Sequence, residues 1–166
     1  MTESDQVGDI FPVNCKLLTK EEITCVADKV RAIPDDEDDL ILPEVIERIL
    51  GTEFCANFRD LYTDNNEVQF RQDVTFLIST ISFYGTEQDR KCIVDCRIPQ
   101  FLLENCTESK DSYTVFCIAT VFSDISCEDN LLHLPSLVKD GLYSKVEELL
   151  VKWRSNDVIV GKLLYM

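Results

Sequence analysis

The side chains most able to do covalent chemistry are one histidine, His133, and eight cysteines. A cysteine nucleophile needs a base to accept its proton, and His133 is the sole histidine that could act as one. The same count excludes a metal site built from several histidines. His133 stands in the apolar stretch LLHLPSL, which is typical of a packed side chain. We therefore expect no catalytic residues and a protein that is not an enzyme.

The cysteines are predicted to be structural. Cys92 and Cys96 are one helical turn apart and could hold a soft metal with two further ligands, but the chain contains no CxxC pair. Reduced, buried thiols are expected at four cysteines that lie among apolar residues, namely Cys25, Cys92, Cys106 and Cys117. No glycine-rich loop precedes a predicted helix, so no phosphate-binding element is indicated. We expect neither a metal nor a cofactor.

Three acidic residues, Asp60, Glu104 and Glu148, recur at intervals of 44 residues. Each lies six residues after an apolar residue, namely Phe54, Ile98 and Leu142. Six residues turn a helix by about 240°, which points these carboxylates away from the core. We call them the acidic row. Carboxylates so placed can accept hydrogen bonds from Lys or Arg of a partner; the alternative is a solvated face.

Further candidate partner-binding residues surround the acidic row. Two positions after Phe54, Ile98 and Leu142, the same face carries Ala56, Gln100 and Ser144. Ten positions after them, it carries Asp64, Glu108 and Lys152. Trp153 ends the last repeated stretch between Lys152 and Arg154. It either packs on the following helix or is exposed as an interface anchor. The predicted partner-binding residues are therefore Asp60, Gln100, Glu104, Ser144, Glu148 and Trp153.

The charge of the chain limits its partners. Thirty-one acidic residues outnumber sixteen basic ones, which gives a formal net charge of −15. Nucleic acids and anionic membranes bind through clustered Lys and Arg, so we expect neither as a partner. The chain begins without the basic and apolar segments of a signal peptide and has no apolar run of about 18 residues. We expect a protein of the cytosol or nucleus whose partner is a protein.

Apolar spacing and capping residues predict an all-helical chain. Residues 1–18 are expected to be a partly ordered N-terminal segment, and residues 19–166 one helical domain. The first helix begins at a capping box formed by Thr19 and Glu22 and ends at Pro34, before an acidic loop over residues 35–39. A second helix is entered through Pro43 and stopped by Gly51. The remaining helices are predicted over residues 52–62, 67–84 as one or two helices, 87–95, 98 onward, 111–126, 128–140 interrupted by Pro135, 142–153 and 155–166.

The chain repeats its apolar pattern every 44 residues. Fifteen positions in three ungapped copies are all apolar, aromatic or Cys: Ile49, Leu50, Phe54, Phe58, Tyr62; Ile93, Val94, Ile98, Leu102, Cys106; and Leu137, Val138, Leu142, Val146, Leu150. Periods of about 40–47 residues are typical of stacked units of two or three helices. The predicted units are residues 19–66, 67–110 and 111–154, with a partial fourth at 155–166.

Three stretches resemble armadillo or HEAT-like repeats. IVDCRIPQFLL, residues 93–103, is similar to the join at which Ile-Pro opens the third helix of an armadillo repeat, and VKDGLYSKVEELL, residues 138–150, is similar to the same join. VFSDIS, residues 121–126, resembles the end of its second helix. Arg97 replaces the family's common Gly, Thr80 and Asp124 replace its Asn, and no Trp precedes them.

The resemblance implies an armadillo-like right-handed superhelix of about three repeats, in which the third helices line the concave face. The favoured hypothesis is a non-catalytic adaptor or scaffold that binds a partner protein on this surface, with a basic segment as the occupant of the acidic row. The alternative is a compact helical bundle that buries an amphipathic partner helix in a groove, as viral inhibitors of host signalling do. Self-association through the apolar C-terminal helix is also left open.

Overall fold

The structure is a computed structural model that describes residues 8, 10–11, 15–34, 38–64, 67–126 and 134–165. Within these ranges the chain is all α, with ten helices and no strand. The helices are α2 (Lys20–Arg31), α3 (Asp38–Leu50), α4 (Phe54–Asp64), α5 (Val68–Tyr84), α6 (Glu87–Asp95), α7 (Ile98–Asn105), α8 (Ser112–Ser126), α9 (Leu134–Lys139), α10 (Leu142–Lys152) and α11 (Asp157–Leu164).

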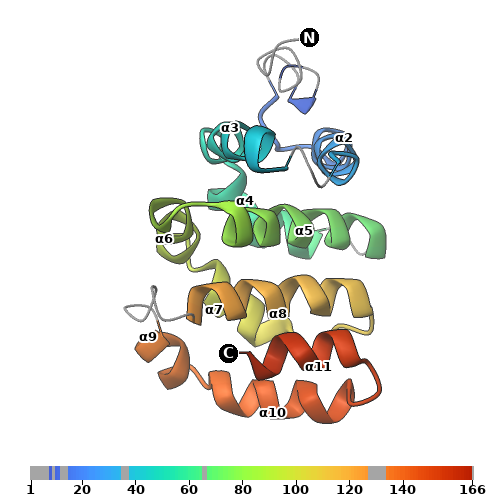
Figure 1. Ribbon diagram of the computed structural model, residues 1–166, viewed down its shortest axis with the longest axis vertical. Helices are drawn as coiled ribbons and strands as arrows, with labels where there is room; N and C mark the ends of the chain where they lie inside the picture. The colour runs from blue at the N-terminus through green and yellow to red at the C-terminus, as the bar shows by residue number, and fades with distance from the viewer. Residues whose placement is uncertain are drawn as a thin grey trace.

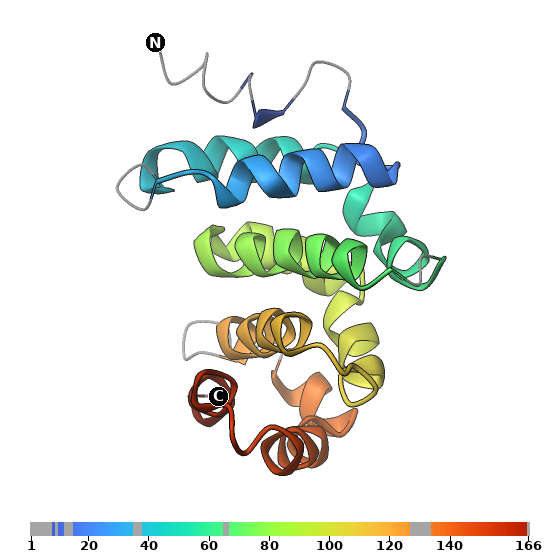
Figure 2. The same cartoon turned by 90° about the vertical axis from the view of Figure 1, so that its right-hand side faces the viewer.

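The helices lie in successive layers along the long axis, from α2 and α3 near the N-terminus to α10 and α11 near the C-terminus (Figures 1 and 2). One row of helices, α2, α5, α8 and α11, runs through all the layers, and each member packs on the next. The shorter helices α4 and α7 pack side by side in a second row, and α3 contacts α6. Helices 44 residues apart therefore occupy neighbouring layers.

Local sequence signals begin several of these helices. The predicted capping box of α2 is confirmed, because the Thr19 side chain accepts from Glu22 N while the Glu22 carboxylate accepts from Thr19 N. Thr86 and Asp89 form an equivalent box at the start of α6. Pro99 stands at the start of α7, where its missing N–H costs nothing, as predicted.

The prediction that the second helix is entered through Pro43 is wrong. Helix α3 begins at Asp38, so Pro43 lies inside it and the expected loop does not extend over residues 38–39. Starting the helix early buries Ile41 and Leu42, which offsets the one hydrogen bond that Pro43 cannot make. Pro135 is the second residue of α9, where proline fits, and the interruption predicted there stays a prediction. The rest of the expected helix over 128–133, with His133, lies outside the described residues.

The repeated apolar positions form the interior of the stack. None of the fifteen is exposed, and Phe58 packs edge-on against the Phe101 ring of the neighbouring unit with ring centres 5.9 Å apart. The C-terminal helix α11 buries Ile159 and Leu163 against the core, so the tail is covered on one side. Its other side leaves Leu164 and Tyr165 exposed.

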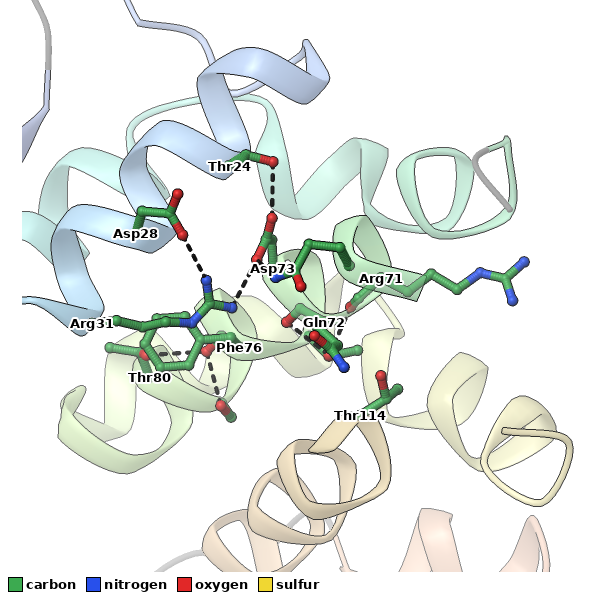
Figure 3. A network of polar contacts seen from close by, with 12 residues as sticks. Thr24, Asp28, Arg31, Arg71, Gln72, Asp73, Phe76, Thr80 and Thr114 are labelled. Atoms are coloured by element: carbon green, nitrogen blue, oxygen red, sulfur yellow. Dashed lines mark hydrogen bonds and ion pairs between the residues drawn. The ribbon is translucent and has the colours of Figure 1, made fainter. Parts of the chain in front are cut away.

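Buried polar contacts connect successive helices of the row formed by α2, α5, α8 and α11. Asp73 of α5 is fully buried and lies between Thr24 and Arg31 of α2 (Figure 3). Its carboxylate accepts from Thr24 Oγ1 at 2.8 Å and pairs with Arg31 Nη2 at 2.8 Å. One layer further on, Ser82 Oγ of α5 donates to Asp124 Oδ2 of α8 at 3.0 Å. These contacts join three of the long helices through their side chains.

None of the helices in the described ranges is long and apolar enough to cross a membrane.

Candidate protein-binding surfaces

The acidic row is exposed on three helices of different layers. Asp60 lies on α4, Glu104 on α7 and Glu148 on α10, and all three residues are exposed. The side chains of Glu104 and Glu148 have 67% and 56% of their surface accessible. Helical geometry alone therefore places the carboxylates where a partner can reach them.

Two members of the acidic row already have basic partners in the same chain. Arg59 Nη2 lies 3.7 Å from Glu104 Oε2, and Lys145 Nζ lies 3.2 Å from Glu148 Oε2. Neither cation is predicted from the sequence to pair with the acidic row, although Arg59 is adjacent to Asp60 and Lys145 is three residues before Glu148. Exposed pairs of this kind are weak, so a partner could displace them. The acidic row is thus a surface of mixed charge.

The remaining predicted residues differ in exposure. Ser144 is exposed on α10, while Gln100 is half-buried on α7 and its Oε1 atom is buried. Trp153 is half-buried and packs against the core, with Lys152 Nζ 5.8 Å from its ring centre. Trp153 therefore has packing contacts, and its role as an interface anchor stays a prediction.

An apolar groove crosses α5 and α8 on another side of the stack. We call it the aromatic groove; its cavity measures about 220 Å³ and its lining includes Phe76, Thr80, Phe83, Tyr113, Phe116 and Lys162. The lining side chains lie about one turn apart along each of the two helices, and Phe83 is 55% exposed. Lys162 Nζ lies 5.2 Å from the Phe83 ring centre, and the Arg31 guanidinium lies 4.5 Å from that of Phe76. The groove is therefore apolar, with the Lys162 ammonium at one end, while the Arg31 guanidinium beside Phe76 is already paired with Asp73 and Asp28.

A second cavity, which we call the arginine cavity, lies between α4 and α7. It measures about 360 Å³ and is lined by Phe58 and Arg59 of α4, and by Arg97, Gln100, Phe101 and Glu104 at and beyond the start of α7. Phe58 and Phe101 are buried beneath it, while Arg59 and Arg97 are exposed. The Arg59 guanidinium lies 5.2 Å from the Phe101 ring centre. The cavity thus combines an apolar floor with two cations.

A polar cavity of about 380 Å³ lies where α4 and α7 end and α5 and α8 begin. Its polar groups mostly hold the connections in place. Arg71 Nε donates to the carbonyl of Tyr62 at 3.3 Å, and Asp111 Oδ2 accepts from Thr114 N at 2.6 Å. Nearby, Lys152 Nζ donates to the carbonyl of Thr107 at 2.7 Å. These contacts are structural.

The described cysteines are all free thiols. Burial raises the pKa of Cys55 to about 12 and the pKa values of Cys106 and Cys117 to about 11, so these thiols stay protonated at neutral pH. Cys25 was expected among buried thiols but is exposed, because it lies on the outer side of α2 beside the buried Val26. Over the described ranges, no three His, Cys, Asp or Glu residues are placed to hold a metal ion.

Comparison of the chain with models of protein families and with curated proteins gives no match.

Proposed function

We propose that the chain is a non-catalytic protein-interaction module, built as an armadillo-like right-handed superhelix of about three repeats. The proposal is supported by the 44-residue apolar register and by the resemblance of residues 93–103, 121–126 and 138–150 to armadillo repeats. The stacking of α2, α5, α8 and α11 is the packing that such repeats require. A location in the cytosol or nucleus remains a prediction.

The aromatic groove is the observation that carries the proposal. Phe83 keeps 55% of its surface exposed within the groove, and apolar surface set in a groove is typical of a binding site. The groove runs across α5 and α8 and takes its lining from residues one turn apart. An amphipathic helix that inserts apolar residues at i, i+3 or i+4, and i+7 matches this lining. An acidic residue at one end of that helix would meet Lys162, as an exposed pair that contributes little to the affinity.

Selection from a displayed library of helical peptides tests this function. We expect enriched peptides to carry the i, i+3/i+4, i+7 apolar pattern and to bind with little dependence on salt, since apolar contacts are not screened. Phe83→Glu should weaken binding at least about tenfold by placing a charge in the groove. The matched control is Val151→Glu, because Val151 is 73% exposed on α10. Equal binding by the Phe83 variant and the wild-type chain would refute the groove.

A second candidate function is the capture of a basic segment on the acidic row. Three exposed carboxylates in successive layers favour it, and the pairing of Glu104 with Arg59 and of Glu148 with Lys145 opposes it. Binding of a Lys- and Arg-rich peptide would then weaken steeply as salt rises. Changing Asp60, Glu104 and Glu148 together to Lys should abolish that binding; if it persists, the row is only a solvated face.

Self-association is a further proposal. Helix α11 exposes Val158 at 64% and Leu164 at 69%, and Tyr165, directly after the helix, is 86% exposed. Light scattering should report a dimer for the wild-type chain and a monomer for Leu164→Glu. A monomeric wild-type chain would refute this proposal.

A further inference from the structure

Two corresponding turns of the chain are made by different residues. Arg97 precedes α7 and Gly141 precedes α10, 44 residues later. Both have a left-handed backbone, with φ of 57° at Arg97 and 96° at Gly141. A left-handed backbone is free of steric cost for glycine but costs stability for a residue with a Cβ atom.

The turn itself does not require an arginine, since Gly141 makes the same turn without a side chain. Arg97 nevertheless occupies the unfavourable conformation, which its N–H stabilises by donating to the carbonyl of Val94 at 2.8 Å. An unfavourable backbone that persists where glycine would serve points to a use for the side chain. That side chain lines the arginine cavity.

The charges in the arginine cavity are only partly used within the chain. In the described part of the protein, Arg97 forms no ion pair. Arg59 pairs with Glu104, but the 3.7 Å separation is long and both side chains are 67% exposed. Such a pair opens at little cost. Two guanidinium groups are therefore open to an incoming anion, in a chain whose net charge is −15.

Gln100 adds a hydrogen-bond acceptor to a cavity in which the arginines supply only donors. Its Oε1 atom is buried and accepts no hydrogen bond from the residues that the structure describes. A buried acceptor left without a donor is unfavourable, so a ligand N–H group gains a hydrogen bond when the Gln100 side chain turns its Oε1 atom into the cavity. A ligand suited to this cavity would carry a carboxylate for the arginines, an N–H for Gln100 and apolar atoms for Phe58 and Phe101.

We propose that the arginine cavity binds an Asp or Glu residue of a partner peptide. The carboxylate lies between the guanidinium groups of Arg97 and Arg59, and the Gln100 side chain turns its Oε1 atom into the cavity to accept a backbone N–H of the peptide. Arg59 exchanges Glu104 for the partner's carboxylate on binding. This inference rests on the proposed role in protein binding but not on the aromatic groove, which lies on α5 and α8.

The test is an NMR titration of the isotope-labelled full chain with the blocked peptide acetyl-Gly-Asp-Gly-amide and with its Asn analogue. We expect the Asp peptide to shift the backbone signals of Arg97 and Gln100 and the Asn peptide to leave them unchanged. Arg97→Gly should bind the Asp peptide about fivefold or more weakly, since a charge-assisted hydrogen bond is lost. Glu104→Gln should bind it more tightly, because Arg59 is released. Lys91→Gln is the charge-matched control, as Lys91 is exposed on α6.

Arg97→Gly has a second expected effect that separates folding from binding. Its thermal midpoint should equal or exceed that of the wild-type chain, because glycine relieves the left-handed backbone at position 97. Unchanged binding of the Asp peptide by this variant would overturn the inference, as would equal shifts from the Asn peptide. If acetate causes the same signal shifts with the same affinity, the assignment of the cavity to a residue of a peptide is wrong. Phe83→Glu should leave this titration unchanged, so failure of the groove and failure of the arginine cavity are distinguishable.

Discussion

Replacement of Asp73 by Ala tests how α2 is held on the rest of the stack. The Asp73 side chain has no accessible surface, and its carboxylate is bonded to Arg31 Nη2 at 2.8 Å, to Thr24 Oγ1 at 2.8 Å and to Gln69 Nε2 at 3.2 Å. Deleting the carboxylate leaves the Arg31 guanidinium between α2 and α5 without its buried counterion. Loss of one partner of a buried pair costs about 3–5 kcal/mol.

The lower end of that range applies here. The Arg31 side chain keeps 25% of its surface accessible and retains Asp28 at 3.1 Å, so part of its charge stays solvated and paired after the change. We therefore expect a loss of about 3 kcal/mol in the free energy of unfolding. For a chain of this length the midpoint of thermal unfolding should fall by about 6–12 °C.

Urea unfolding followed by circular dichroism measures this loss. The matched control is Asp28→Ala, which removes the exposed partner of the same arginine and should cost no more than about 0.5 kcal/mol. The double variant Asp73→Leu with Arg31→Met removes both charges and should recover most of the stability, since two apolar groups of similar volume leave no charge unpaired. A loss below about 1 kcal/mol for Asp73→Ala would refute the reasoning and show that the buried pair contributes little.

Two glycine substitutions should change the stability of the fold in opposite directions, and one aspartate substitution should change it in a pH-dependent way. Gly161→Ala in α11 should stabilise the fold by about 0.5–1 kcal/mol, because a Cβ there meets nothing within 4 Å and alanine favours a helix. Gly85→Ala should destabilise it by about 1–3 kcal/mol, because the new Cβ would lie 2.3 Å from the Ile81 carbonyl oxygen; thermal unfolding distinguishes the two signs. Burial raises the pKa of Asp111, but hydrogen bonds to its carboxylate, including those from Thr114, outweigh burial and lower the pKa overall. The ionised carboxylate therefore stabilises the folded chain at pH values above about 4, the pKa of Asp in the unfolded chain. Asp111→Ala should therefore cost about 0.5–2 kcal/mol at pH 7 and progressively less as the pH falls below about 4; a penalty that is the same at pH 3 and pH 7 would contradict this assignment.

The sequence predicts the helices well where local chemistry begins or ends them. The capping box at Thr19, the turn at Gly85 and the Ile98–Pro99 start of α7 are all correctly placed, because each depends on residues within one turn of the chain. Pro43 is the exception. Its place inside α3 follows from the burial of Ile41 and Leu42, which is a gain that local rules do not include.

The candidate surfaces are less predictable. The exposure of Asp60, Glu104 and Glu148 follows from counting residues around a helix. The aromatic groove and the arginine cavity do not, since each forms between helices that are far apart in the sequence. Arg97 gave the one available signal, because it replaces a glycine at a recurring turn.

The sequence by itself determined that this chain is helical, which side of each helix faces inward and which carboxylates face out, because helical periodicity is a local property of 3.6 residues per turn. Only the tertiary structure decided which side chains meet across helices. Asp73 finds Arg31 42 residues earlier in the chain, Arg59 reaches Glu104 on another helix, and Trp153 turns toward the core. Contacts of this kind depend on how the helices stack. The free energy that stabilises the stacking comes from the whole buried interior rather than from any one segment.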